Sequence, residues 1–206
     1  MLWYCPGYSA LLMFSSITRT QPGNLVVALA ILVASLLLFG NGIRGDFVLD
    51  DKFVIVGNPL IGSKLDRFWD IFISPYHFEQ PRTGLYRPLT IASYAVNWFV
   101  FGSSPVSFHV VNILLHAGVV LALFVLAKRL AGFRAAAIAA LLFLVLPIHV
   151  EDVTSLIGRA ELLSALGVLL ALLCVLEGKW WGAALAFFLA LLSKETAIAF
   201  MPLMFF

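Results

Sequence analysis

The chain has 206 residues, of which 62% are hydrophobic and 12% are charged, and its formal net charge at pH 7 is +2. A soluble domain carries about twice that share of charged residues, so the composition excludes an ordinary soluble protein and predicts a membrane protein with several spans. The small net charge and the lack of a basic patch in the sequence indicate no nucleic-acid partner.

The first apolar run, Leu25 to Phe39, predicts a first span over about residues 25–40, because roughly 17–25 apolar residues cross the hydrocarbon core. Residues 1–24 hold one basic residue, Arg19, and we predict no definite element for them. A secretory signal peptide would start with a positively charged run, so a retained anchor helix fits the sequence better.

A long outer loop is expected over residues 41–106, because its first part, 41–87, contains six acidic and six basic residues. Within this loop, Arg67–Ser74 has apolar residues at helical spacing, which predicts a short amphipathic helix at the membrane interface. The segment Tyr86–Gly102 has Pro88 at a position that suits a first helical turn. Its apolar part is too short for a span, so we predict a second interfacial helix.

Four further apolar runs predict spans, at about residues 107–127, 135–148, 161–177 and 181–193, and another begins at 197. The final "MPLMFF" lies inside that last run, so we expect the polypeptide to continue beyond it. The predicted fold over residues 25–206 is an all-α integral membrane protein. It is a multi-span helical bundle with a long first outer loop that carries interfacial helices.

The orientation follows from Lys128, Arg129 and Arg134, a basic connection that is expected to face the cytoplasm. Alternating spans then place the outer loop, the connection 148–161 and residues 194–195 on the opposite side, provided that the second interfacial helix does not cross. Three polar clusters, none of which set the orientation, therefore meet at one periplasmic or lumenal face. The sequence allows either a bacterial inner membrane or the endoplasmic reticulum.

Two adjacent carboxylates, Asp50 and Asp51, are the first candidates for chemistry. Adjacent side chains point apart in a helix or a strand, so one can face a cavity while the other caps a helix or binds a loop amide. A carboxylate beside apolar surface has a raised pKa and accepts a proton more readily. An ordinary solvated turn is an equally good interpretation of the pair.

The stretch "FHVVNILLH" places His109, Asn112 and His116 on one stripe of a predicted helix. A polar stripe in a membrane helix must face protein or water, because an unpaired polar group in hydrocarbon costs several kcal/mol. Hydrogen bonding between helices is the favoured interpretation for His116. His109 lies nearest the outer face and is the candidate site residue.

A third cluster, "LPIHVEDVTSLIGRAELL", packs His149, Glu151, Asp152, Arg159 and Glu161 between two spans. A guanidinium at the start of a membrane helix suits a phosphate better than an apolar ligand. The H-x-E spacing is a weak metal signature, so we predict no metal site. The alternative is an ordinary connection whose acids lie near a helix start.

Lys194 and Glu195 interrupt the last apolar region, and Arg87 is another cation near the outer interface. Neighbours on a helix diverge, so Lys194 and Glu195 need separate partners. A structural network, with Lys194 paired to an acid of the third cluster and Glu195 paired to Arg159, is the main alternative to a role in ligand binding.

Several of these pieces resemble one family when they are taken in order and with their spacing. They are "VLDD", "GNPLI", "YRPLT", "FHVVNILLH", "PIHVEDVTSLIGRAELL" and "LLSKETA", within residues 45–206. Together they resemble the membrane domain of the transmembrane and tetratricopeptide-repeat O-mannosyltransferases, in the GT-C glycosyltransferase superfamily. Members usually carry tetratricopeptide repeats, which these 206 residues lack, and a histidine before the proline of "PIHVE", where this chain has Leu146.

The resemblance implies inverting transfer of mannose from a polyprenyl-phosphate donor to a serine or threonine hydroxyl. It implies that the catalytic base is an acid of the first outer loop, which here is Asp50 or Asp51. Candidate phosphate contacts are then Arg87, Arg159 and Lys194. Candidates for binding the sugar or orienting the cations are His149, Glu151 and Glu161.

The expected partners are the lipid-linked donor, a protein or glycan acceptor, and membrane lipid. No cofactor is predicted, and the need for a divalent metal is left open. The alternatives are a GT-C transferase that uses another sugar or a lipid or glycan acceptor, a membrane transporter or flippase, and a non-catalytic scaffold. Polar residues near the bilayer centre and on both sides would favour transport.

Overall fold

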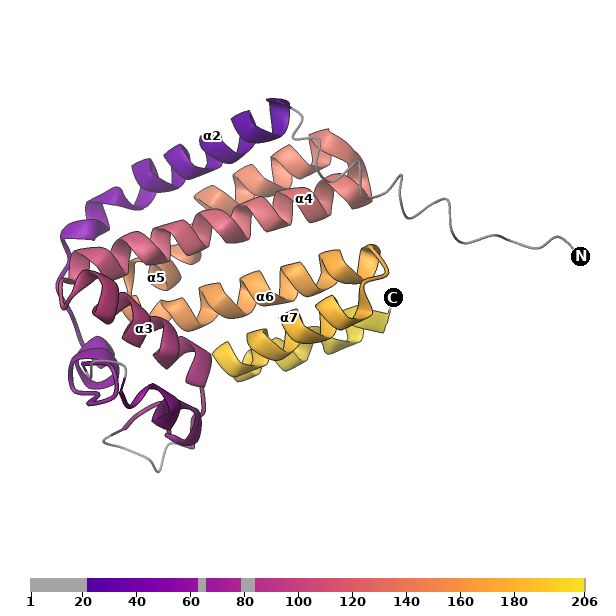
Figure 1. Ribbon diagram of the computed structural model, residues 1–206. Coiled ribbons are helices and arrows are strands. Elements are labelled where there is room, and N and C mark those ends of the chain that lie inside the picture. The colour runs from indigo at the N-terminus through magenta and orange to yellow at the C-terminus, as the bar shows by residue number, and fades with distance from the viewer. Residues whose placement is uncertain (1–21, 63–65, 79–83, 206) are drawn as a thin grey trace, which may run out of the picture.

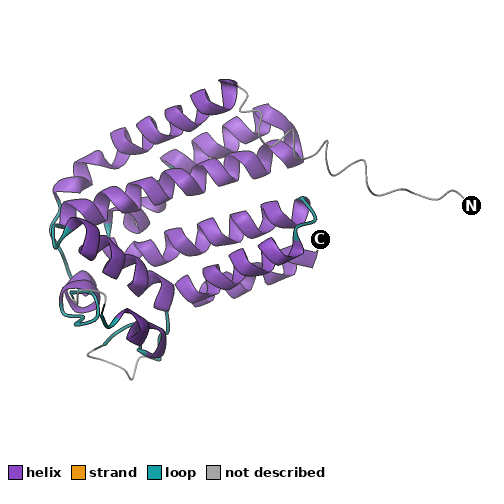
Figure 2. Cartoon of the chain, in the orientation of Figure 1, coloured by secondary structure: helices purple, strands orange, loops and turns teal. Residues whose placement is uncertain are grey.

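A computed structural model describes residues 22–62, 66–78 and 84–205. Of residues 1–24, for which no definite element was predicted, the first 21 lie outside the described residues. Within these ranges the regular elements are helices joined by loops (Figure 2). The α-helices are α2 (Pro22–Phe39), α3 (Pro88–Phe101), α4 (Pro105–Val145), α5 (His149–Thr154), α6 (Arg159–Leu176) and α7 (Trp180–Ser193). The remaining helices are η1 (Gly40–Arg44), η2 (Lys52–Val56), η3 (Phe68–Ile73), η5 (Leu156–Gly158) and η6 (Glu195–Phe205).

Three helical stretches among the described residues are long and apolar enough to cross a membrane: Leu25–Arg44, Pro105–Val145 and Leu156–Leu176. The apolar helices α3, α7 and η6 are shorter. With 14 residues, α7 lies below the roughly 17 residues that an ideal crossing needs. The described chain is thus an all-helical protein with three candidate membrane spans.

Helix α4 is a hairpin, because its chain reverses at Gly132 (Figure 1). Gly132 has φ 82°, a left-handed conformation that glycine adopts without the steric cost of a Cβ. Ala117, Val120 and Phe124 on the first arm belong to one buried cluster with residues 136, 140 and 144 on the second. The two arms correspond to the spans predicted at 107–127 and 135–148, with the basic connection at the reversal.

Helices α6 and α7 pack closely against each other because small residues face one another. A Cβ added at Gly167 would lie 2.9 Å from Ala190 Cβ and 3.0 Å from the Ala186 carbonyl oxygen. Small side chains of this kind let helix backbones approach without a cavity between them. The connection between the helices turns at Gly178, where φ is 69°.

The outer loop contributes to a buried core that it shares with α3, α4 and η5. Val54 and Ile55 of η2 and Ile71 of η3 are fully buried in a cluster that includes Tyr94 of α3. Phe68 and Phe72 pack against the same cluster, so this face of η3 contacts protein, whereas Trp69 and Ile73 are exposed. The location of η3 at the membrane interface stays a prediction. Hydrophobic spacing identifies a buried face, but it does not distinguish lipid from protein as the covering.

Candidate functional site

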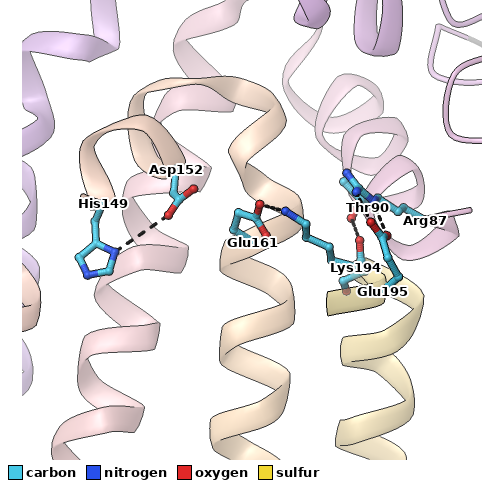
Figure 3. Close-up of polar contacts among 8 residues, drawn as sticks. Arg87, Thr90, His149, Asp152, Glu161, Lys194 and Glu195 are labelled. Atoms are coloured by element: carbon cyan, nitrogen blue, oxygen red, sulfur yellow. Dashed lines mark hydrogen bonds and ion pairs between the residues drawn. The ribbon is translucent and has the colours of Figure 1, made fainter. Parts of the chain in front are cut away.

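A polar cavity of about 250 Å³ lies where the outer loop meets the first turn of α6 and the end of α7. It gathers five of the residues predicted for the site from distant parts of the chain: Asp50, Arg87, Glu151, Glu161 and Lys194. Tyr76, His77, Asp152, Ile157 and Gly158 also line it. The cavity therefore combines four carboxylates with two cations (Figure 3 shows part of this cluster).

Asp50 and Asp51 are separated by their environments. Asp50 is exposed and lines the cavity. Asp51 is 1% exposed, and its two carboxylate oxygens accept hydrogen bonds from the backbone N–H groups of Val48 and Ile157, both at 3.1 Å. Burial raises the pKa of Asp51, opposed by these two backbone hydrogen bonds. Both carboxylate oxygens of Asp51 are therefore occupied by hydrogen bonds within the protein, whereas the carboxylate of Asp50 can contact a ligand in the cavity.

Each of the two cations lining the cavity is paired with a carboxylate (Figure 3). Arg87 donates to Glu195 through Nε at 2.9 Å and through Nη2 at 2.5 Å, and its guanidinium lies over the Tyr76 ring at 4.9 Å. The hydrogen bond to Glu195 raises the pKa of Arg87. Lys194 forms an ion pair with Glu161. Burial lowers the pKa of Lys194, and an anionic ligand must compete with the two carboxylates for these cations.

The ends of α3 and α7 are joined beside these pairs. The Thr90 hydroxyl in the first turn of α3 donates to the Ser193 carbonyl oxygen at the end of α7, at 2.9 Å (Figure 3). This contact brings Arg87, just before α3, close to Lys194 and Glu195, just after α7. The network considered from the sequence is therefore partly present: Lys194 pairs with Glu161, whereas Glu195 pairs with Arg87.

Arg159, predicted to contact a phosphate, lies inside the protein and does not line the polar cavity. Its exposure is 0%, and it donates to Asn112 Oδ1 at 2.9 Å and Asn97 Oδ1 at 3.0 Å. It also donates to the carbonyl oxygens of Phe108 at 3.0 Å and Ser93 at 3.4 Å. A planar guanidinium can satisfy several acceptors at once. Arg159 therefore ties α6 to α3 and α4, a role that its two asparagine partners could have suggested.

The two histidines predicted for the site also lie outside the cavity lining. His109 is buried under the outer loop, where a Cβ on Gly45 would lie 3.0 Å from its Nε2. His149 stacks on Phe143 at 4.0 Å between ring centroids, and its Nδ1 is 4.0 Å from Asp152 Oδ2 (Figure 3). Burial lowers the pKa of His149 and raises that of Asp152. His149 therefore lies behind Asp152, which lines the polar cavity.

A second, apolar cavity of about 410 Å³ adjoins the polar one. Both are lined by Asp152 and Glu161, and the apolar cavity continues between α4, α6 and η6. Its further lining includes Val119, Phe143, Ala165, Val168, Leu172 and Phe200. Together the cavities offer a charged compartment at the helix ends and an apolar compartment along the helices.

Sequence reasoning missed Tyr76 and His77 as residues of the cavity. Their signal in the sequence is an aromatic residue next to a histidine inside a polar loop, which is common in loops that bind nothing.

Metal binding gains no support from the described residues, in which no group of three His, Cys, Asp or Glu side chains is placed to hold an ion.

The cavity lies at the end of the bundle opposite the basic connection. Arg129, before the reversal of α4, forms an ion pair of 2.6 Å with Glu177, at the connection between α6 and α7. Lys194 and Glu161, by contrast, lie at the other ends of these two helices. Over the described residues, fold and site together define a helical membrane protein with a charged cavity at one end of its apolar helices.

Comparison with curated proteins places the chain more closely. It is 38% identical over 146 residues to mouse protein O-mannosyl-transferase TMTC1. The matched region covers 68% of this chain and 16% of the relative. It is 37% identical over 161 residues to human protein O-mannosyl-transferase TMTC4 (68% and 21%). The Caenorhabditis elegans protein O-mannosyl-transferase F38B6.6 is 32% identical over 193 residues (87% and 27%).

These relatives confirm the resemblance of the chain to the TMTC proteins, which are named protein O-mannosyl-transferases. It spans about a sixth to a quarter of the length of these curated relatives. No family model matches the chain, and no solved structure matches it.

Proposed function

We propose that the chain is the membrane part of an inverting GT-C-type glycosyltransferase. It moves mannose from a polyprenyl-phosphate donor to a serine or threonine hydroxyl of a protein, on the non-cytoplasmic side of the membrane. The relatives support the activity, since they are named protein O-mannosyl-transferases. The observation that carries the proposal is the shared wall of the charged and apolar cavities at Asp152 and Glu161.

The paired cavities fit the chemistry of a lipid-linked sugar phosphate. A polyprenyl chain is apolar and stays out of water, so it requires an apolar compartment at membrane depth. Its phosphate requires cations at the end of that compartment, because an unpaired charge at this depth is costly. Arg87 and Lys194 lie in the polar cavity, where they can bind the phosphate when it displaces Glu195 and Glu161 from them.

Asp50 is the catalytic base in this proposal. It removes the proton from the acceptor hydroxyl while that oxygen attacks the anomeric carbon of the sugar. The bond between this carbon and the phosphate oxygen breaks on the opposite face, so the configuration inverts. The electron pair leaves with the polyprenyl phosphate, whose developing charge the two cations stabilise. Asp51 is unsuited to this role because both of its oxygens accept backbone hydrogen bonds.

The positive-inside rule supports a site on the non-cytoplasmic side. Arg129 and the other basic residues near the α4 reversal lie at the end of the bundle away from the cavity. Basic connections of this kind face the cytoplasm. The charged cavity then faces the periplasm or the lumen, where a secreted or membrane protein presents its hydroxyl groups.

The proposal is tested in membranes that contain the protein, with radiolabelled polyprenyl-phosphate sugars and an acceptor protein. We expect transfer from the mannose donor and its loss in Asp50→Asn, a substitution that removes the negative charge at nearly constant shape. Undiminished transfer by Asp50→Asn would exclude Asp50 as the base. Transfer from a different sugar in the panel, or to a lipid or glycan, would instead correct the donor or the acceptor.

A further inference from the structure

We propose that Asp51 is a positioning residue that holds the catalytic base, Asp50, at a set place relative to the start of α6. This inference rests on the proposed function and deepens it. Asp51 joins two segments that are 106 residues apart: one carboxylate oxygen accepts the Ile157 N–H and the other accepts the Val48 N–H, both at 3.1 Å. Asp51 itself is 1% exposed, although the two hydrogen bonds are only partly buried.

The turn that carries Asp50 depends on these contacts. Leu49 has φ 44°, a left-handed conformation that residues with a Cβ rarely adopt. Its side chain is 83% exposed, so packing does little to hold it there. The turn is closed by hydrogen bonds from the Asp51 N–H to the Val48 carbonyl oxygen at 2.9 Å and from the Lys52 N–H to the Leu49 carbonyl oxygen at 3.2 Å. Asp51 closes it further through its side chain.

The other end of the connection is rigid. Ile157 belongs to η5, which two buried side chains hold by its backbone: the Tyr94 hydroxyl donates to the Leu156 carbonyl oxygen at 2.8 Å, and Asn112 Nδ2 donates to the Ser155 carbonyl oxygen at 3.1 Å. Ile157 lines the polar cavity together with Asp50. The Asp51 carboxylate therefore fixes the loop that bears the base to a firmly held wall of the same cavity.

A carboxylate is needed because both contacts come from N–H donors. An asparagine at position 51 keeps one acceptor oxygen and turns its NH₂ group toward the other donor, so one contact is lost. The turn at Leu49 then has less to hold it, and Asp50 moves away from its working place. A displacement of about 1 Å at a reacting group can lower the rate about 100-fold.

The kinetic test compares three substitutions in the outer loop. Asp51→Asn is expected to lower kcat about 10- to 100-fold, with the KM for the donor changed less than about twofold, because Arg87 and Lys194 still bind the phosphate. Asp50→Asn should remove transfer. The matched control is Asp46→Asn, whose carboxylate accepts only the adjacent Phe47 N–H among the contacts observed and should leave kcat unchanged.

Amide hydrogen exchange provides a readout that needs no sugar transfer. In Asp51→Ala, exchange is expected to rise at the Ile157 amide and in peptides covering residues 47–52, whereas Asp50→Ala should leave the Ile157 amide unchanged. If wild-type protein transfers no sugar, the proposed function fails while the exchange arm still tests the connection.

Three outcomes would overturn the inference. The first is wild-type kcat in Asp51→Asn. The second is loss of transfer in Asp51→Asn while Asp50→Asn stays active, which would make Asp51 the base. The third is unchanged exchange at Ile157 in Asp51→Ala.

Discussion

Replacing Gly158 by alanine gives the sharpest test of how the cavity wall is built. A Cβ at this position would lie 2.3 Å from the Asp152 carbonyl oxygen, 2.6 Å from its Cα and 2.7 Å from its carbonyl carbon. Ordinary contacts of a Cβ begin near 3.4 Å, so the two segments must separate by about 1 Å. All three contacts are with backbone atoms, so no flexible side chain can move aside.

The expected cost follows from this geometry. Inserting a methyl group into a well-packed site costs about 1–3 kcal/mol, and a rigid neighbour favours the upper end of that range. For a chain of this size, each kcal/mol lowers the melting temperature by about 2–4 °C. Asp152 lines both cavities, so the same movement should reshape the site and lower sugar transfer by more than the loss of folded protein explains.

The assay is thermal unfolding of the protein in detergent or in lipid nanodiscs, combined with sugar transfer in membranes. The control is Gly40→Ala, because a Cβ at Gly40 would meet nothing within 4 Å. We expect Gly40→Ala to behave like wild type and Gly158→Ala to melt about 4–12 °C lower. Equal melting temperatures for the two variants would show that the α5–α6 connection yields easily, and the reasoning would be wrong.

Three further predictions concern the helices behind the site. Arg159→Lys should lower the free energy of unfolding by about 2–4 kcal/mol, because an ammonium cannot satisfy the acceptors that the buried guanidinium binds; thermal unfolding equal to wild type would contradict this. Gly167→Val should cost about 1–3 kcal/mol by forcing α7 away at Ala190, whereas Gly118→Ala, whose nearest neighbour is at 3.9 Å, should be mild. Burial lowers the pKa of His149 from 6.5, so the unfolded chain takes up its proton first as the pH falls. The contribution of neutral His149 to the folded state is therefore full above pH 6.5 and declines below it. His149→Phe should reduce the fall in melting temperature on acidification. An unchanged fall would exclude His149 as its cause.

The local features of this chain could be read from its sequence. The apolar runs marked the helices, and Pro88 begins α3 as its restricted φ predicts. The two predicted spans on either side of the basic connection are the arms of α4, which reverse at a glycine. The ordered motifs were sufficient to identify the resemblance that the curated relatives confirm. All of these depend on composition, local conformation or motif order, which do not require knowledge of what packs against what.

The partners of the charged groups were decided by the tertiary structure. Asp50 and Asp51 are chemically identical neighbours, and only the approach of Ile157, 106 residues away, separates a buried carboxylate from an exposed one. Arg159 looked as suitable for a phosphate as Arg87, yet one is enclosed by α3 and α4 and the other lines the cavity. The physical reason is that burial and electrostatics depend on every segment that surrounds a group, whereas a sequence shows only its neighbours along the chain.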